Sequence, residues 1–307
     1  MNMADTLRLE GLRGELKAHE PMARHVSWRA GGPAARCYSP ADLDDLAVFL
    51  RQLPAAEPLL FVGLGSNLLV RDGGFAGTVV LTHAAARHPE LIDGRLYAEA
   101  GVASPKVARY AARNALVGAE FLVGVPGTVG GALAMNAGCY GGETWEIVER
   151  AVTIDRRGQV RTRSRDEFES GYRYCALKDG GRLGEDEWFA GAWFDLRKGD
   201  GAASRARIKE LLEKRIASQP LSLPNAGSVF RSPPGDHAAR LIESCGLKGL
   251  ARGGARVSEK HANFIVNPKG AARASDIEWL IDEVRARVLE RTSIALLPEV
   301  RIVGEPA

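Results

Sequence analysis

Two glycine-rich segments of this 307-residue sequence are best suited to bind a ligand: Gly63-Leu64-Gly65-Ser66-Asn67, and the run from 124 to 142, which holds seven glycines. Glycine loses the most freedom on folding, so such runs indicate either tight turns or a main chain that lies directly against a ligand. Without Cβ atoms in the way, consecutive N–H groups form concavities that bind anions such as phosphate. Further hydrogen-bonding side chains in the two segments are Ser66, Asn67, Thr128 and Asn136.

Neither segment fits the common nucleotide-binding loops. In the first, Leu68 stands where a dinucleotide fingerprint needs its third glycine, and no evident helix follows. The second contains no Gly-Lys-Ser or Gly-Lys-Thr, so it is not a P-loop. One interpretation is purely structural, with tight turns packed against a sheet. The other is that a long ligand, such as a dinucleotide, lies between the two segments.

The formal net charge of +3 is unevenly distributed along the sequence. Between positions 201 and 270 there are twelve Lys or Arg and five acidic residues, an excess of +7, so the remainder sums to −4. This excess indicates either a basic surface patch or a segment that holds an anionic ligand. Nucleic-acid binding is the least favoured option, because the segment lacks the aromatic platforms that single strands need.

The composition predicts a globular protein of the reducing cytoplasm. Hydrophobic residues make up 45% and charged residues 26%, and no apolar run approaches the roughly 18 residues that span a bilayer. The first twenty residues mix charges of both signs without an apolar stretch, so no signal peptide is predicted. The cysteines, at 37, 139, 175 and 245, form no Cys-x-x-Cys pair, and the histidines form no metal-binding pattern. We therefore expect reduced thiols, no metal and no membrane contact.

Strands and helices mix along the whole sequence, which favours an α+β fold over a doubly wound parallel sheet. Ser39-Pro40 and Ser104-Pro105 are typical helix starts, and they predict helices that end before Pro54 and at Gly118. The best candidate linker is the glycine-rich segment at 198–202. Further helices are predicted at 204–217, 238–245 and 275–291, strands at 59–62, 78–82, 188–196, 262–267 and 300–303, and a hairpin at 151–163.

Several stretches together resemble one enzyme family. Residues 61–70, and residues 124–132 with 135–138, are similar to the two FAD-contacting segments of the UDP-N-acetylenolpyruvoylglucosamine reductases. The resemblance extends from about His25 to Gly304. Because several motifs occur in the same order, it is far more specific than a single glycine loop. The other similar stretches are 171–174, 225–230, 297–304 and 246–267, of which the last resembles the shorter variant of the family.

The resemblance implies a fold and a cofactor. The fold is α+β, with a two-part FAD-binding region of the PCMH or vanillyl-alcohol-oxidase kind and a C-terminal α+β substrate domain. The implied subdomains are 1–83 and 84–200 for FAD and 201–298 for the substrate, with the strand at 299–307 able to return to the first. FAD is expected to bind non-covalently. The implied cofactor-binding residues are Gly63, Leu64, Gly65, Ser66, Asn67, Leu68, Gly124, Pro126, Gly127, Thr128, Gly131, Ala132, Asn136 and Gly138.

The implied reaction reduces UDP-N-acetylglucosamine enolpyruvate to UDP-N-acetylmuramate for peptidoglycan, with NADPH as hydride donor. By motif, Arg173 is the cation that binds the carboxylate or enolate through two hydrogen bonds; without the resemblance it would be a surface charge on a strand-like segment. Ser228 is the proton donor, and Glu299 assists at the enol. The implied residues for the anionic UDP-sugar are Arg173, Arg231, Lys248, Lys260 and His261.

One position departs from the family pattern, because Cys175 stands where a small hydroxyl residue is common and makes weaker hydrogen bonds. Two other functions stay open. One is another FAD-dependent oxidoreductase of the same fold that acts on a different small anionic substrate, and the other is a nucleotide-binding module without activity. The joint presence of Arg173, Ser228 and Glu299 in their motifs favours the reductase. We expect a monomer.

Overall fold

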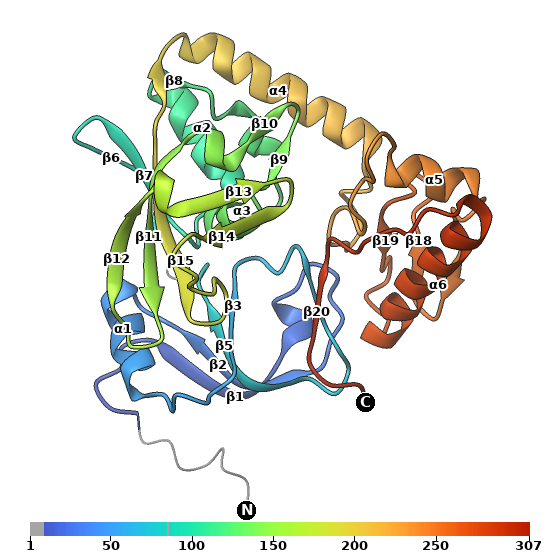
Figure 1. Cartoon of the computed structure of the whole chain (residues 1–307), viewed down its shortest axis with the longest axis horizontal. Coiled ribbons are helices and arrows are strands. Elements are labelled where there is room, and N and C mark those ends of the chain that lie inside the picture. The colour runs from blue at the N-terminus through green and yellow to red at the C-terminus, as the bar shows by residue number, and fades with distance from the viewer. Residues whose placement is uncertain (1–8, 85) are drawn as a thin grey trace, which may run out of the picture. The chain divides into compact units, whose positions relative to one another are not determined.

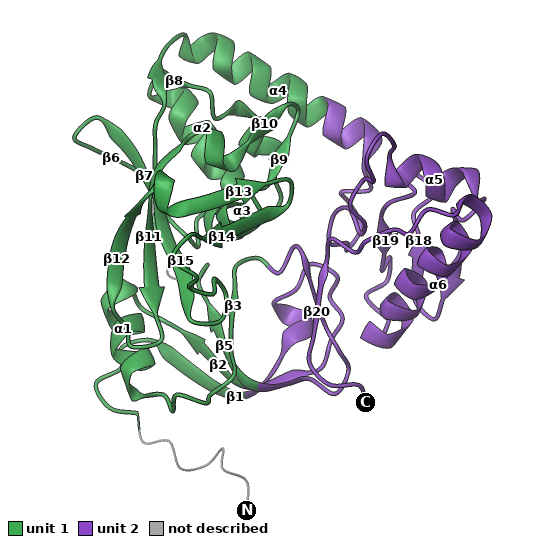
Figure 2. Cartoon of the chain, viewed as in Figure 1, with its two compact units in different colours: residues 1–18, 36–64, 77–213 green, residues 19–35, 65–76, 214–307 purple. Residues whose placement is uncertain are grey.

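The computed structural model describes residues 9–84 and 86–307 and has the predicted mixture of helices and strands (Figure 1). The chain divides into two compact units (Figure 2). Strands β1 (Glu15–Pro21), β2 (Pro33–Ser39) and β5 (Phe75–Leu81) and helix α4 (Gly201–Ser218) contribute residues to both. Each unit is therefore assembled from stretches that are far apart in the sequence. Unit 1 comprises residues 1–18, 36–64 and 77–213, and unit 2 comprises residues 19–35, 65–76 and 214–307.

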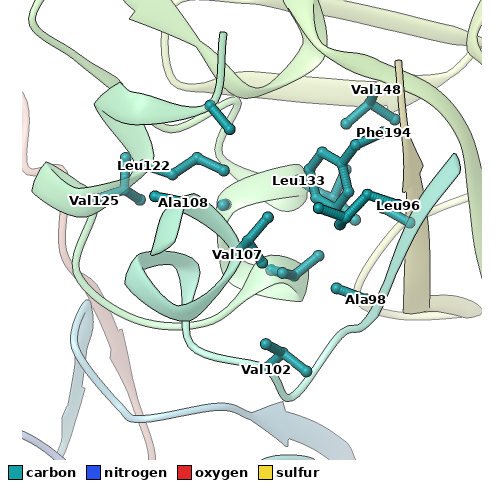
Figure 3. Packing of buried hydrophobic residues seen from close by; sticks show 14 of the residues in the cluster. Leu96, Ala98, Val102, Val107, Ala108, Leu122, Val125, Leu133, Val148 and Phe194 are labelled. Carbon is teal, nitrogen blue, oxygen red and sulfur yellow. The ribbon is translucent and has the colours of Figure 1, made fainter. Parts of the chain in front are cut away.

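The main core of unit 1 lies against a five-stranded antiparallel sheet in the order β12-β11-β15-β7-β6. Successive side chains of a strand point to opposite faces, so Leu96 and Ala98 of β7 (Arg95–Glu99) are buried while the other three residues of the strand are not. Figure 3 shows both packed in one cluster with Val107 and Leu133 of two helices. The other elements are β6 (Glu90–Ile92), β11 (Val148–Asp155), β12 (Val160–Ser164), β15 (Glu187–Phe194), α2 (Ser104–Arg113) and α3 (Val129–Ala134).

A second sheet has the order β1-β2-β5-β3, and β3 (Leu59–Val62) runs parallel to β5. Helix α1 (Leu43–Gln52) packs beside it, with the ring of Phe49 stacked on that of Tyr38 at a centroid distance of 3.9 Å. Asp45 of this helix is buried, and its carboxylate accepts hydrogen bonds from the Tyr38 hydroxyl and from the N–H groups of Arg13 and Ala41. The buried charge is thus fully hydrogen-bonded, as burial requires.

Unit 1 also contains several short strand pairs and 3-10 turns. β13 (Phe168–Gly171) and β14 (Tyr174–Leu177) form a hairpin, and β9 (Gly138–Cys139) pairs with β10 (Gly142–Glu143). β8 (Leu116–Val117) pairs with β16 (Arg197–Lys198). Three 3-10 turns complete the unit: η3 (Glu120–Gly124), η4 (Thr144–Glu146) and η5 (Arg165–Glu167).

In unit 2, a three-stranded antiparallel sheet packs against the long helix α6 (Ala274–Thr292). The buried residues of α6 recur at three- and four-residue spacing from Ile277 to Val288, which makes one face apolar. The indole N–H of the buried Trp28 donates to the carbonyl of Ile265 at 2.7 Å and ties the 19–35 stretch to this sheet. The remaining elements are η2 (Met22–Arg24), α5 (Ala238–Ser244), β17 (Ala251–Arg252), β18 (Ala255–Val257), β19 (Ile265–Val266) and the parallel pair β4 (Leu68–Val70) and β20 (Arg301–Val303).

The predicted start of α1 at Ser39-Pro40 is wrong. Ser39 ends β2, and α1 begins at Leu43. The N-cap is Asp42, whose carboxylate accepts a hydrogen bond from the N–H of Asp45 at 2.9 Å. Asp caps a helix as well as Ser does, so the Ser-Pro pair did not decide between the two starts.

Helix α2 is shorter than predicted. Its N-cap is Ala103, so Ser104 is the first helical residue instead of the cap. The helix ends at Arg113 and not at Gly118, because Ala115 takes a left-handed φ of 53° and β8 then pairs with β16. A non-local strand pairing has overridden the local helical pattern here.

The other predicted elements fall where expected, with two differences. The strand predicted at 262–267 is limited to β19, because the N–H of Phe264 donates to the carbonyl of His261 in a turn. The candidate linker at 198–202 is occupied at its ends by β16 and α4, and the division between the units falls inside α4, between positions 213 and 214. The helices α4, α5 and α6, the strands β3, β5, β15 and β20, and the hairpin of β11 and β12 are confirmed.

Candidate functional site

The two glycine-rich segments meet in unit 1. A Cβ atom added to Gly63 would lie 2.3 Å from the Oγ1 atom of Thr128, the N-cap residue of α3. No side chain fits at that distance, so position 63 must be glycine for the segments to approach. Gly127, next to the cap, has a left-handed φ of 94°, which glycine adopts without strain. These two glycines serve the close approach of two main-chain segments.

The start of α3 is partly open. The N–H groups of Val129 and Gly130 donate to the carbonyls of Val102 and Ala100 at 2.9 and 2.8 Å, which fixes the loop to the segment after β7. Gly131 is exposed, and the nearest atom to a Cβ placed on it would be the Oγ1 of Thr128, 4.0 Å away. Its main chain therefore faces open space, as a surface that receives a large flat or phosphate-bearing group requires. The residues present fit FAD at this loop.

Four other residues predicted to bind the cofactor are packed against neighbouring parts of the protein. Leu68 and Ala132 are buried in β4 and α3. A Cβ on Gly138 would lie 2.4 Å from the carbonyl oxygen of Gly142, so this glycine allows β9 and β10 to pair closely. Asn136 is 3% exposed, and both polar atoms of its side chain bind protein groups. These residues shape the loops from within.

In unit 2, Asn67 lies next to the predicted acid. Its side-chain N–H donates to the main-chain carbonyl of Glu299 at 3.1 Å, and its main-chain carbonyl accepts from the N–H of Arg301 at 3.0 Å. The parallel pairing of β4 with β20 brings these positions together. Gly65, with a φ of 59°, allows the preceding turn to approach the carbonyl of His25, 2.2 Å from where a Cβ would lie. A predicted cofactor residue thus holds the main chain of a predicted catalytic residue.

Ser228 and Glu299 are held on neighbouring stretches of main chain. The N–H of Glu299 donates to the carbonyl of Val229 at 2.7 Å, and the N–H of Arg231 donates to that of Leu297 at 2.9 Å. Both Ser228 and Glu299 are half-buried, so their side chains are accessible from solvent. Unit 2 therefore brings together the predicted proton donor and the predicted acid, which are 71 positions apart in the sequence.

Asn263 supports this pairing, and the sequence did not single it out. It is 5% exposed, its side-chain oxygen accepts from the N–H of Phe230 at 3.0 Å, and its side-chain N–H donates to the carbonyl of Phe230 at 2.8 Å. The main-chain carbonyl of Asn263 accepts from the N–H of Val229 at 2.9 Å. An amide that pairs with the main chain in this way acts as an additional strand partner. The one sequence signal was a polar residue inside an otherwise apolar run, Asn263-Phe264-Ile265-Val266.

Arg173 lies in a turn and not on a strand, in contrast to the strand-like segment that the sequence indicated. The turn joins β13 to β14, and Arg173 has a left-handed φ of 56°. This conformation costs a residue with a side chain about 1–2 kcal/mol. The guanidinium carbon lies 5.3 Å from the centroid of the Tyr172 ring, within cation–π range. Several other non-glycine residues, Ala115 among them, share a left-handed φ, so the conformation alone does not assign a function to Arg173.

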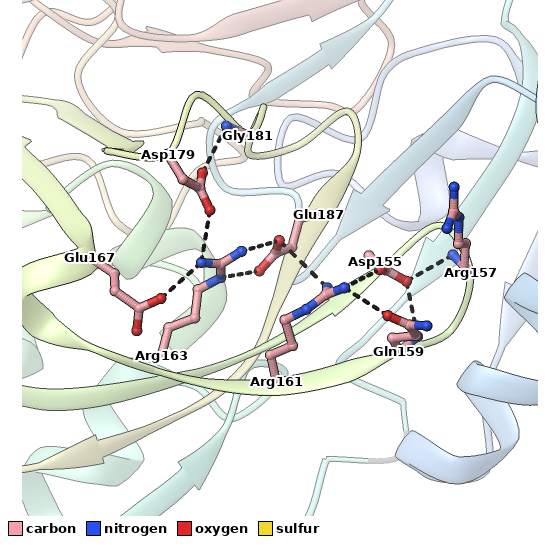
Figure 4. A network of polar contacts seen from close by, with 9 residues as sticks. All are labelled: Asp155, Arg157, Gln159, Arg161, Arg163, Glu167, Asp179, Gly181 and Glu187. Carbon is pink, nitrogen blue, oxygen red and sulfur yellow. Dashed lines mark hydrogen bonds and ion pairs between the residues drawn. The ribbon is translucent and has the colours of Figure 1, made fainter.

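The base of this hairpin is fixed by a network of ion pairs (Figure 4). The guanidinium of Arg163 donates to Glu187 of β15 at 2.7 and 2.9 Å. It also contacts Glu167 at 2.9 Å and Asp179 at 3.1 Å, one on each side of the hairpin. Arg163 and Glu187 are both mostly buried, where an ion pair is screened little by solvent. The network therefore anchors the base of the hairpin on the large sheet.

The predicted substrate cations differ in how they are used within unit 2. Lys248 pairs with Glu243 at 2.5 Å, and Lys260 donates to the carbonyl of Ile216 at 2.6 Å. Burial and the nearby Lys248 lower the pKa of His261, so this ring is neutral at pH 7. The Nε atom of Arg231 is buried, and no residue in 9–84 or 86–307 accepts a hydrogen bond from it. This buried donor is therefore available to a ligand, as the predicted role of Arg231 requires.

Cys175, the departure from the family pattern, is a partly buried free thiol. Burial raises its pKa to about 12, so only about 10⁻⁴ of it is thiolate at pH 8. We expect iodoacetamide to leave Cys175 unmodified in the folded protein at pH 8 and to alkylate it after unfolding in urea. Mass spectrometry of the peptide that contains it gives the measurement. Alkylation in the folded protein at the urea-unfolded rate would contradict the assignment.

Within 9–84 and 86–307, no group of three or more His, Cys, Asp or Glu side chains is arranged to hold a metal ion. Over the same residues, no helix combines the length and the apolar character needed to cross a membrane.

Comparison with known proteins identifies the family. A family model described as "FAD binding domain" matches residues 34–164, and one described as "UDP-N-acetylenolpyruvoylglucosamine reductase, C-terminal domain" matches residues 219–303. The solved UDP-N-acetylenolpyruvylglucosamine reductase of Thermus caldophilus is 31% identical, with a TM-score of 0.77 over 95% of this chain and 99% of that one.

Two relatives extend the match over nearly the full length. The UDP-N-acetylenolpyruvoylglucosamine reductase of Nitrosospira multiformis is 56% identical over 98% of this chain and 92% of its own length. The enzyme of that name from Thiobacillus denitrificans is 58% identical over 96% of this chain and 94% of its own. Similarity at this level and coverage confirms the resemblance and the fold, and this chain belongs to the UDP-N-acetylenolpyruvoylglucosamine reductase family.

Proposed function

We propose that this protein reduces UDP-N-acetylglucosamine enolpyruvate to UDP-N-acetylmuramate for peptidoglycan synthesis, with bound FAD and with NADPH as reductant. The observation that carries the proposal is the pairing of the Ser228 and Glu299 segments by main-chain hydrogen bonds, in a chain of this family. A proton donor and an acid held together are what protonation of an enolate needs. Together with the family match, this pairing favours the reductase over a different flavin oxidoreductase or an inactive nucleotide-binding module.

The loops of 63–68 and 124–138 are the proposed place of FAD. The main chain at Gly131 is uncovered there, and Pro126 of the same loop is also exposed. When bound, FAD supplies a hydride, received from NADPH, to the methylene carbon of the enolpyruvyl group. The protein must bind the flavin non-covalently and hold the substrate in position.

Arg173, Ser228 and Glu299 then act on the substrate. After hydride addition the substrate carries an enolate conjugated with its carboxylate. Arg173 binds and stabilises this negative charge through its planar pair of donors. Ser228 gives its hydroxyl proton to the carbon next to the carboxylate, and Glu299 assists at the enol oxygen. A hydroxyl is a weak acid, so the basicity of the enolate drives the transfer.

One set of spectra tests the proposal. The purified protein with FAD should absorb in the flavin bands, NADPH should bleach them anaerobically, and the enolpyruvyl nucleotide should restore them. A protein that binds no flavin would favour the inactive module. A reduced protein that is reoxidised by oxygen but not by the enolpyruvyl nucleotide would favour another oxidoreductase.

Arg231 is the proposed contact for an anionic group of the UDP-sugar. Hydrogen bonds to charged groups contribute about 1.5–3 kcal/mol. We therefore expect Arg231→Gln to raise KM for the enolpyruvyl nucleotide about 10- to 100-fold. KM of the unsubstituted enzyme should also rise with salt, because exposed charges are screened.

Arg256→Gln, which removes an exposed arginine of β18, is the matched control and should leave KM nearly unchanged. If neither Arg231→Gln nor added salt changes KM, Arg231 does not bind an anionic group of the UDP-sugar.

Three further statements remain predictions of the sequence. They are the division into 1–83, 84–200 and 201–298, a monomeric state and a cytoplasmic location. Limited proteolysis, light scattering and cell fractionation test them in that order.

A further inference from the structure

We propose that Asn136 is a positioning residue for Arg173 and acts through the main-chain carbonyl of Gly171. Asn136 belongs to the second glycine-rich segment, whereas Arg173 belongs to the hairpin of β13 and β14. Both lie in unit 1. This role rests on the proposed function in one respect, because Arg173 is taken to bind the substrate carboxylate.

The side chain of Asn136 joins three parts of unit 1. Its N–H₂ group donates to the carbonyl of Gly171 at 3.1 Å and to the carboxylate of Glu143 at 2.8 Å. Its oxygen accepts from the N–H of Trp145 at 3.0 Å. With 3% of the residue exposed, these bonds are shielded from water, and loss of any one of the three would leave a buried donor or acceptor of Asn136 unsatisfied.

The position also demands this residue type. Asn136 has a left-handed φ of 39°, which Asn and Asp adopt more readily than other residues with a side chain. Gln is too long for these distances, and Asp has no N–H to donate to Gly171. Asn alone combines the conformation with a donor on one side and an acceptor on the other.

The bond to Gly171 acts close to the arginine. The base of the hairpin is held by Arg163, by the N–H of Lys178 bonded to the carbonyl of Glu167 at 2.9 Å, and by the Phe168 ring against that of Trp145. At the other end, a Cβ placed on Gly171 would meet no atom within 4 Å. No side chain packs on Gly171 from that direction, and the Asn136 bond to its carbonyl fixes the main chain two residues before Arg173. The glycine-rich segment proposed to hold the cofactor therefore also sets the position of the substrate cation.

Asn136→Asp is the sharpest test, because it keeps the size of the side chain and the acceptor for Trp145 but places an oxygen against the carbonyl of Gly171 and the carboxylate of Glu143. In the FAD-loaded enzyme, we expect flavin binding and reduction by NADPH near the unsubstituted values. The dissociation constant for the enolpyruvyl nucleotide, read from the flavin spectrum, should rise on the order of 10-fold, since a displacement of about 1 Å can cost about 100-fold. Hydrogen exchange of the 171–174 turn should accelerate.

A double-mutant cycle separates positioning from general damage. If Asn136 acts through Arg173, Asn136→Asp has little further effect in Arg173→Met but its full effect in Ser228→Ala. Asn114→Asp, which loses a similar bond to the carbonyl of Tyr110 at the end of α2, is the matched control and should change neither readout. If Asn136→Asp does not fold, Asn136→Gly, which accepts the left-handed φ, replaces it in the same cycle.

Three results would overturn the proposal. The first is that Asn136→Asp changes neither the dissociation constant for the enolpyruvyl nucleotide nor the exchange rate of the turn, and the second is that it weakens nucleotide binding equally with and without Arg173. The third is that Asn136→Asp no longer binds FAD, which would place Asn136 at the cofactor. A different result would reject the assigned role of Arg173 instead. If Arg173→Met binds and turns over the substrate normally, the proposed function loses its cation, while hydrogen exchange of the turn in Asn136→Asp still reports on the positioning contact.

Discussion

Ser228→Ala will slow turnover of the enolpyruvyl nucleotide at least about 100-fold, because a positioned general acid contributes about 10²- to 10⁴-fold, or roughly 3–5 kcal/mol of barrier. FAD binding and reduction of the flavin by NADPH will stay near the unsubstituted values, since the hydroxyl acts on the substrate alone. Anaerobic stopped-flow absorbance measures the two half-reactions separately, and only reoxidation of the flavin by the enolpyruvyl nucleotide should slow.

Ser222→Ala is the matched control, because Ser222 is an exposed serine of the same segment. It should reoxidise at the unsubstituted rate. Near-normal reoxidation in Ser228→Ala would remove Ser228 from the mechanism. The hydroxyl would then serve the turn before Val229 and nothing else.

Arg173→Met should lower kcat/KM for the enolpyruvyl nucleotide by about 10²- to 10³-fold, the loss typical when one preorganised donor to a developing negative charge is removed. The Met side chain keeps much of the apolar stem, so the change removes mainly the charge and the fork of donors. Arg173→Lys should recover part of the loss, because it restores the charge without the two parallel hydrogen bonds. Steady-state kinetics of the three enzymes at one ionic strength give the comparison.

Arg157→Met serves as the control, since Arg157 is exposed in the turn between β11 and β12 of the same unit. Equal kcat/KM in Arg173→Met and Arg157→Met would show that the Arg173 charge has no part in the reaction. A loss in Arg173→Met that Arg173→Lys restores completely would mean that charge matters and the fork geometry does not.

The sequence by itself determined which two segments are rich in glycine, the order of the motifs and most of the helices. A glycine lets another segment come close to its main chain, and this property is encoded locally by the missing side chain. The Thr128 side chain beside the main chain of Gly63 is an example. Helices such as α6 carry their own apolar period, so their position needs no knowledge of partners. Local patterns predicted the wrong start for α1, where Asp42 is the cap. They also predicted the wrong end for α2, where β8 pairs with the distant strand β16.

Only the tertiary structure decided how the site residues are held. The bonds from Asn263 to Phe230, from Asn67 to Glu299 and from Asn136 to Gly171 join positions 33, 232 and 35 residues apart. The left-handed turn at Arg173 is also absent from any local pattern, because nothing in the residue type favours it. Such contacts depend on which main-chain carbonyls the fold leaves within reach of a buried amide, and that is settled only when the distant strands have packed.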